Sequence, residues 1–145
     1  MITDTTIRPF ASIDRALLAL LVAQPLQIDD TTTAVPEAQV GGDFAYQPTM
    51  PWYIRIDKVP GGSSDRFGGQ FIVDIEVFAA DYLLAESVAF AIEALLLGYP
   101  HVVEVDGRKV VIDDVSQNAS PAELPWEDDS VSRLGSTYVL TARRR

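Results

Sequence analysis

The segment Gln70-Phe-Ile-Val-Asp-Ile-Glu-Val-Phe-Ala-Ala-Asp-Tyr-Leu-Leu-Ala-Glu-Ser-Val-Ala-Phe-Ala-Ile-Glu-Ala-Leu-Leu-Leu-Gly98 changes its hydrophobic period halfway, and this change decides the fold class. From Gln70 to Phe78, apolar and polar residues alternate, which predicts a half-buried β-strand. From Tyr82 to Leu97 the chain is apolar almost all round, with Asp81 as a candidate N-cap and Gly98 at the end, which predicts a helix. Such a helix lies between two layers or faces another subunit.

A second alternating run, Trp52 to Val59, precedes this segment and predicts the first strand of a β-hairpin. The intervening residues 61–69 contain two glycine pairs, so we expect a flexible hairpin tip there. Across the polar face, Arg55 can meet Asp74 or Glu76, for a gain of roughly 0.2–1 kcal/mol per pair.

The rest of the chain predicts a single α+β domain over residues 1–145, a mostly antiparallel β-sheet with two main helices packed on one face. Residues 26–51 carry little pattern, so we expect an irregular arm or long loop, with at most a short strand in it. The other expected elements are a helix at Ser12–Gln24 with Ser12 as N-cap, a hairpin at Val102–Val115 turning at Asp106-Gly107, a loop at Ser116–Ser130 and a last strand at Leu134–Arg143.

Composition excludes several classes of protein. The chain has 145 residues, 48% of them hydrophobic, a formal net charge of -10 and no cysteine. The acidic balance disfavours binding to nucleic-acid phosphates or anionic membranes, and disulfides and thiolate metal sites are impossible. The start lacks a signal-peptide pattern, and the longest apolar stretch is too short and too charged for a bilayer. We therefore expect no membrane association.

Acidic residues are the first candidates for chemistry. They cluster at Asp29-Asp30, Asp113-Asp114 and Glu127-Asp128-Asp129, and two carboxylates can bind a divalent cation or share acid–base work. Neighbouring residues of a strand point to opposite faces, however, and solvated turn carboxylates or caps are the far commoner case. His101 is the only histidine, which excludes a histidine-rich metal site. We therefore expect no enzyme activity, no catalytic or metal residues, and no cofactor.

Three further features have an ordinary and a functional interpretation. The glycine pairs lack the lysine of a phosphate-binding loop, which favours a hairpin tip that orders against a neighbouring subunit. The run Arg143–Arg145 either is a solvated terminus or contacts an acidic partner surface or DNA. Trp126 either closes over the edge of the core or anchors a subunit contact, and both remain open.

The closing segment Leu124-Pro-Trp-Glu-Asp-Asp129, followed by Arg133 and then Tyr138-x-Leu-x-x-Arg143, resembles the tail terminator (tail completion) proteins of long-tailed bacteriophages. The strand Val73–Phe78 before an apolar helix, and the glycine-tipped hairpin upstream of it, are similar to the centre of that family. The resemblance covers roughly residues 51–145.

The resemblance implies a virion assembly protein that caps the head-proximal end of the tail tube and ends its polymerisation. It also implies a ring, typically a hexamer, whose partners are the tail tube protein and the head–neck connector, with DNA passing through. Such a protein is made in the host cytoplasm and resides in the virion. The alternatives are another connector or neck protein, the tube protein itself, a small metal-dependent enzyme and a dimeric binding module. The candidate interface residues are Gly61, Gly62, Asp65, Arg66, Phe67, Trp126, Glu127, Asp128, Asp129 and Arg133.

Overall fold

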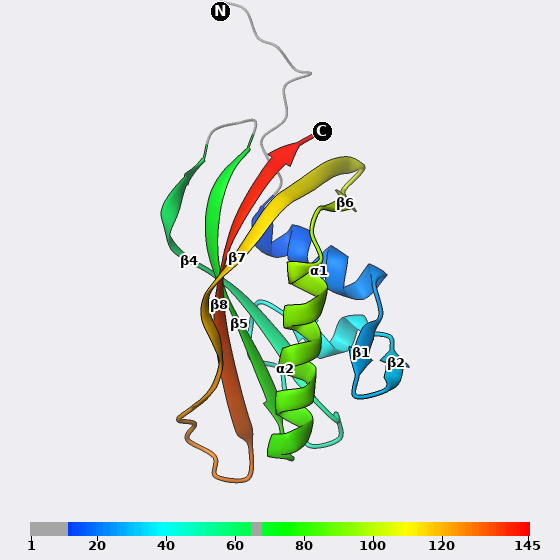
Figure 1. The fold of residues 1–145 in the computed structure, drawn as a ribbon. Helices are drawn as coiled ribbons and strands as arrows, with labels where there is room; N and C mark the ends of the chain where they lie inside the picture. Colours follow the sequence, from blue (N-terminus) through cyan, green and yellow to red (C-terminus); the bar gives the residue numbers. More distant parts are fainter. Residues whose placement is uncertain (1–11, 65–67) are drawn as a thin grey trace, which may run out of the picture.

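The computed structural model describes residues 12–64 and 68–145, and its main feature is one curled six-stranded sheet (Figure 1). The strand order is β3-β4-β5-β8-β7-β6, and only the short β3–β4 pair is parallel. The strands are β3 (Val40–Gly41), β4 (Tyr53–Ser64), β5 (Gly68–Ala79), β6 (His101–Val105), β7 (Arg108–Leu124) and β8 (Ser132–Arg144).

Two helices, α1 (Ile13–Ala23) and α2 (Tyr82–Leu97), cover the same face of the sheet (Figure 1). Their buried side chains form one core with the inward-facing residues of the strands, which confirms the predicted α+β class. Alternation along β4 places Trp52, Ile54 and Ile56 in this core, as the sequence pattern predicts.

The two predicted N-caps behave differently. The carboxylate of Asp81 accepts a hydrogen bond from the Leu83 backbone N–H at 3.0 Å, so α2 has a side-chain cap. Ser12 precedes α1 in extended geometry, but its hydroxyl makes no capping hydrogen bond. Position alone therefore identified the start of both helices, while only one carries the predicted cap.

The central hairpin extends further than expected. From Tyr53 to Val59, β4 pairs with β5 in regular register, with Arg55 opposite Glu76. The strands also run into the predicted tip, because Gly61 and Gly62 belong to β4 and Gly68 begins β5. A register shift between Val59 and Ser63 accommodates the two glycines, both with positive φ, so residues 61–64 and 68–69 of the predicted tip belong to strands.

The expectation of a loop at Ser116–Ser130 is wrong over its first half, because β7 continues to Leu124 beside β8. The sequence of this part is mostly polar and contains Pro121, so it lacks the alternation of apolar and polar residues that predicts a strand. Strand β6 pairs with β7 only as far as Ile112, so the lower part of β7 is an edge strand within the described residues. A proline is tolerated at such an edge, and three register irregularities occur along this pair.

The expectation of an irregular arm over residues 26–51 is also partly wrong. The chain forms a small hairpin, β1 (Leu26–Ile28) with β2 (Thr31–Thr33), a 3-10 turn at Glu37–Gln39, and β3. Buried Leu26 and Ile28 anchor the hairpin against α2, where Ser87 Oγ donates a hydrogen bond to Asp29 Oδ1 at 2.9 Å. Within residues 26–51, the irregular parts are the turn at 29–30, the short link at 34–36 and the stretch at 42–51.

Candidate interface site

A second, smaller apolar cluster lies on the face of the sheet opposite the helices. Tyr53 and Phe78 are paired across β4 and β5, and both are buried although they lie outside the main core. Residues following β3 and the loop between β7 and β8 cover them. Tyr53 Oη donates a hydrogen bond to the Asp43 carbonyl oxygen at 2.6 Å, which ties this covering segment to the sheet, and burial raises the pKa of Tyr53.

Three aromatic rings from distant parts of the sequence meet in this cluster. The ring centroids of Phe44 and Phe78 are 4.8 Å apart, those of Phe44 and Trp126 are 5.0 Å apart, and those of Phe78 and Trp126 are 5.1 Å apart. Edge-on and tilted contacts at these separations are the favoured aromatic geometries. Phe78 is fully buried, whereas Phe44 remains 43% exposed, so the cluster reaches from the sheet to the surface.

Arg133 connects the loop to the sheet. Its guanidinium forms an ion pair with the buried carboxylate of Glu76, and Arg55 approaches the same carboxylate at 3.6 Å. Arg133 Nη1 also donates to the Pro125 carbonyl oxygen at 3.1 Å, and its Cζ lies 5.3 Å from the Trp126 ring centroid. A planar guanidinium can satisfy these partners at once. The prediction that Arg55 meets Glu76 is confirmed.

The turn after Trp126 is held by Asp128. Its Oδ1 accepts hydrogen bonds from the Ser130 hydroxyl at 2.6 Å and from the Ser130 backbone N–H at 2.9 Å. These bonds favour the ionised carboxylate and hold the pKa of Asp128 below its ordinary value. The turn therefore presents Glu127 and Asp129 as exposed side chains in a defined backbone.

Beside the aromatic cluster lies a pocket of about 300 Å³, here called the aromatic–acidic pocket. Its walls combine aromatic and apolar groups with carboxylates from the turn. They come from the segment after β3, from the end of β5 and from the β7–β8 loop: Phe44, Tyr46, Pro48, Ala80, Trp126, Glu127, Asp128, Ser130 and Val131. This chemistry suits a side chain with an apolar stem and a positive head.

The candidate interface residues fall into two groups at opposite ends of the sheet. Gly61 and Gly62 lie at the end of β4, whereas Trp126, Glu127, Asp128, Asp129 and Arg133 surround the β7–β8 loop at the other end (Figure 1). Asp65, Arg66 and Phe67 lie outside the described residues. The structure brings together the second group but not the two groups with each other.

Sequence reasoning missed Phe44, Tyr46 and Phe78 as members of the site. The signal for Phe78 is its parity, because it follows Asp74 and Glu76 on the polar face of β5, where an exposed phenylalanine needs a cover. Phe44 and Tyr46 lie in a segment without a periodic pattern, so their positions depend on tertiary contacts. Trp126 does pack over the edge of a buried cluster, which supports one of its two interpretations and does not test the other.

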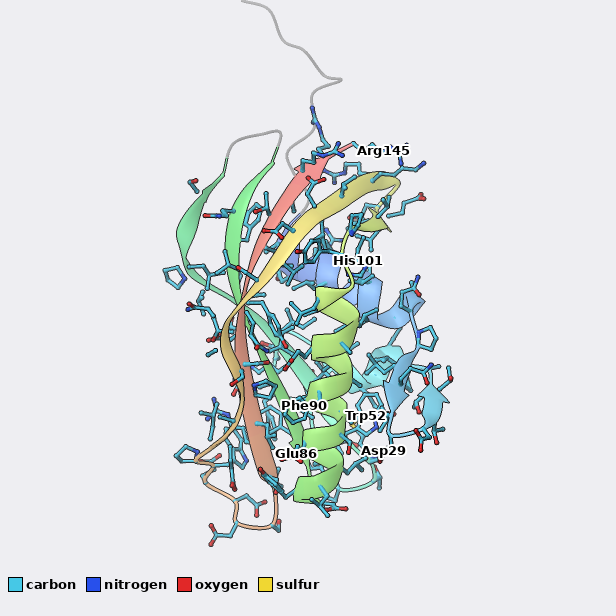
Figure 2. All side chains as sticks on the ribbon, viewed as in Figure 1. Asp29, Trp52, Glu86, Phe90, His101 and Arg145 are labelled. Atoms are coloured by element: carbon cyan, nitrogen blue, oxygen red, sulfur yellow. The ribbon has the colours of Figure 1, made fainter. Side chains whose placement is uncertain are left out.

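An apolar stripe runs along the outer side of α2. Leu83, Phe90 and Leu97 follow one another at intervals of seven residues and are 67%, 49% and 41% exposed. Figure 2 shows Phe90 on this helix, away from the helix ends. The described helices include none that is long and apolar enough to cross a membrane.

Three of the remaining candidates for chemistry make structural contacts, namely Asp113, Asp29 and His101. Asp113 pairs with Arg143 at 3.0 Å, and Asp29 accepts the hydrogen bond from Ser87. His101 Nε2 lies 3.3 Å from the Leu96 carbonyl oxygen at the end of α2. In the described parts of the chain, no three histidine, aspartate or glutamate side chains come together in a possible metal site.

Comparison with known proteins identifies a shared fold. Neither the protein-family models nor the curated proteins show a match to this chain. Among solved structures, a chain from the virion of a native gene transfer agent particle superposes with a TM-score of 0.54 at 16% identity, covering 88% of this chain and 85% of that one. A second solved chain superposes with a TM-score of 0.42 at 16% identity, covering 91% of this chain and 89% of the other, which is too distant to establish a common fold. The chain thus has the fold of a protein found in a virion particle.

Proposed function

We propose that this chain is a non-enzymatic structural protein of a phage-type virion, which caps the head-proximal end of the tail tube and joins the tail to the head–neck complex. In this role it forms a closed ring, with a hexamer as the expected size, and it ends tube polymerisation. The observation that carries the proposal is the fold shared, over nearly the whole of both chains, with a component of a gene transfer agent virion.

The closing segment supports the more specific assignment. The residues by which the chain resembles tail terminators run from Leu124 to Arg143. The connection between β7 and β8 within this segment is held by Trp126 packing and by the Arg133–Glu76 ion pair. A rigid, partly apolar loop at one end of a subunit is a suitable docking element, since little conformational entropy is lost when it binds.

The mechanism of capping that we propose is steric. One face of the ring pairs with the end of the tube, while the opposite face lacks the surface that recruits another tube subunit. A heterologous contact closes into a ring when its rotation permits and otherwise grows into a filament, so termination depends on closure. The net charge of -10 fits a central hole through which DNA passes without adhering.

The test is binding to isolated tail tubes with exposed ends. We expect electron microscopy to show the purified protein at one end of each tube, and elongation by added tube subunits to stop at that end. Absence of the protein from tube ends would refute the assignment. Growth of the purified protein into long tubes would instead identify it as the tube protein. Trp126→Ala should lose this binding, and Trp126→Phe, which keeps an aromatic ring in the cluster, is its matched control for folding.

A further inference from the structure

Trp126, which lines the aromatic–acidic pocket, already packs against one arginine of its own chain. Arg133 lies over the Trp126 ring at 5.3 Å while a carboxylate neutralises its charge. The lining of the pocket has the same combination of groups, because Phe44, Tyr46 and Trp126 contribute aromatic rings and Glu127 and Asp128 contribute carboxylates. A second guanidinium would find cation–π and ionic partners there.

An arginine suited to this pocket lies at the other end of the same molecule. The side chain of Arg145 is exposed, and its backbone N–H donates to the Lys109 carbonyl oxygen at 3.1 Å, which fixes the backbone beside β7. Arg143 is held by its ion pair with Asp113. The basic run is therefore presented from ordered backbone at the upper end of the sheet, where Figure 2 labels Arg145.

The pocket cannot be reached by the arginine run of its own chain. Strand β8 begins next to the pocket-forming loop and ends at Arg144, and a strand of its 13 residues spans about 40 Å. The loop and the arginine run lie at opposite ends of the molecule (Figure 1). A contact between the two features therefore joins two copies of the chain.

We propose that Arg145 of one subunit inserts its guanidinium into the aromatic–acidic pocket of the next, with Glu127 as its ionic partner. The two patches are different surfaces, so the contact is heterologous and runs head to tail, which is the type that closes into a ring when its rotation permits. This inference rests on the proposed function, because it supplies a contact between the subunits of the assembly. It also assigns distinct roles to the two ends of the sheet.

Charge reversal with rescue tests the contact in the intact chain. We compare the wild type, Glu127→Arg, Arg145→Glu and the double variant by sedimentation velocity at low ionic strength over a range of concentrations. Each single reversal should weaken self-association by about tenfold or more, and the double variant should recover much of it. Asp57→Arg, at an exposed acidic residue away from the pocket, changes the net charge by as much as Glu127→Arg does; it is the control for that variant and should leave association unchanged.

Direct proximity can be measured because the natural chain has no cysteine. A mixture of Glu127→Cys and Arg145→Cys variants, treated with a short bismaleimide, should give a crosslinked 1:1 dimer more readily than either variant alone. A chain carrying both cysteines should give a ladder of larger products. Equal crosslinking in all samples would contradict the head-to-tail contact.

The outcomes separate this inference from the proposed function. A wild type that stays monomeric in solution, or an oligomer insensitive to both reversals, overturns the Arg145 contact, and an insensitive dimer points to the stripe on α2 instead. The capping function is judged independently by tube-end binding. If both reversal variants still cap tube ends as the wild type does, the function stands and this contact is wrong.

Discussion

At the scale of single residues, Glu76 is the only buried charged side chain among the described residues. It is 6% exposed and depends on Arg133 and Arg55 for its charge balance. A buried charge that loses a partner is far more costly than a surface ion pair is stabilising. The loop that carries the candidate interface therefore depends on a charge pair that also stabilises the sheet.

Arg133→Met should lower the free energy of unfolding by about 2–4 kcal/mol, because it leaves the Glu76 carboxylate with only the more distant Arg55. The measurement is chemical denaturation at neutral pH. Adding Glu76→Gln to this variant should restore part of the loss, since the unpaired charge is then removed. If the double variant is as unstable as the sum of the single ones, the two side chains are not coupled.

Trp126 packs against Phe44 and Phe78, and in our proposal it also contributes to the contact that assembles the virion. Trp126→Ala should cost about 1–3 kcal/mol, because the ring is half-buried against Phe78 and Phe44, and Trp126→Phe should cost less than about 1 kcal/mol. At a temperature where all variants are folded, we expect the alanine variant to lose tube-end binding. Normal binding by a folded alanine variant would leave this residue a purely structural role.

At the scale of elements, the two helix starts provide a matched comparison. Asp81→Ala removes the hydrogen bond to the Leu83 N–H and should cost about 1 kcal/mol. Ser12→Ala should change stability by only a few tenths of a kcal/mol, because the Ser12 hydroxyl makes no capping bond. Thermal unfolding of both variants checks this, and equal losses would contradict the assignment of the caps.

Two glycines with similar backbone angles should respond differently to alanine. Gly62 has φ of 72°, and a Cβ atom there would lie 2.1 Å from the Gln70 carbonyl oxygen, whereas Gly107 has φ of 74° and open space around it. Gly107→Ala should therefore cost only the strain of the left-handed conformation, about 1–2 kcal/mol. Gly62→Ala should cost more, because backbone of β5 must also move, and unfolding measurements on the pair will show the difference.

At the scale of the whole molecule, charge destabilises the folded subunit and, in our proposal, stabilises the contact between subunits. The net charge of -10 produces self-repulsion within the folded chain, which added salt screens. The proposed contact between Arg145 and the aromatic–acidic pocket is attractive, and salt weakens it. The same change in ionic strength should thus stabilise the subunit and loosen the assembly.

Raising the salt concentration from low ionic strength to about 0.5 M should increase the free energy of unfolding by on the order of 1 kcal/mol and shift the sedimentation distribution toward the monomer. The two measurements are made on the same samples of wild-type protein. Arg145→Glu, which has already lost the contact, should show the first effect without the second. An assembly strengthened by salt would point to an apolar contact such as the α2 stripe.

The sequence by itself determined the fold class, the helix at Tyr82–Leu97 with its cap, and the hairpin pairing that puts Arg55 opposite Glu76. These features depend on local periodicity and on neighbouring strands, and such short-range preferences are written directly in the residue order. The closing segment also predicts Trp126, the acidic turn and Arg133 as members of one candidate interface.

Only the tertiary structure decided what surrounds those residues. The length of β7 depends on pairing with β8 along an edge that tolerates Pro121, and Phe44 reaches Trp126 through a segment without periodic pattern. The tertiary structure also places the glycine-bearing end, where the arginine run lies, and the Trp126 loop at opposite ends of the sheet, so a contact between Arg145 and this loop requires a second copy of the chain. Contacts between residues far apart in sequence depend on packing, and a single sequence carries no local signal for them.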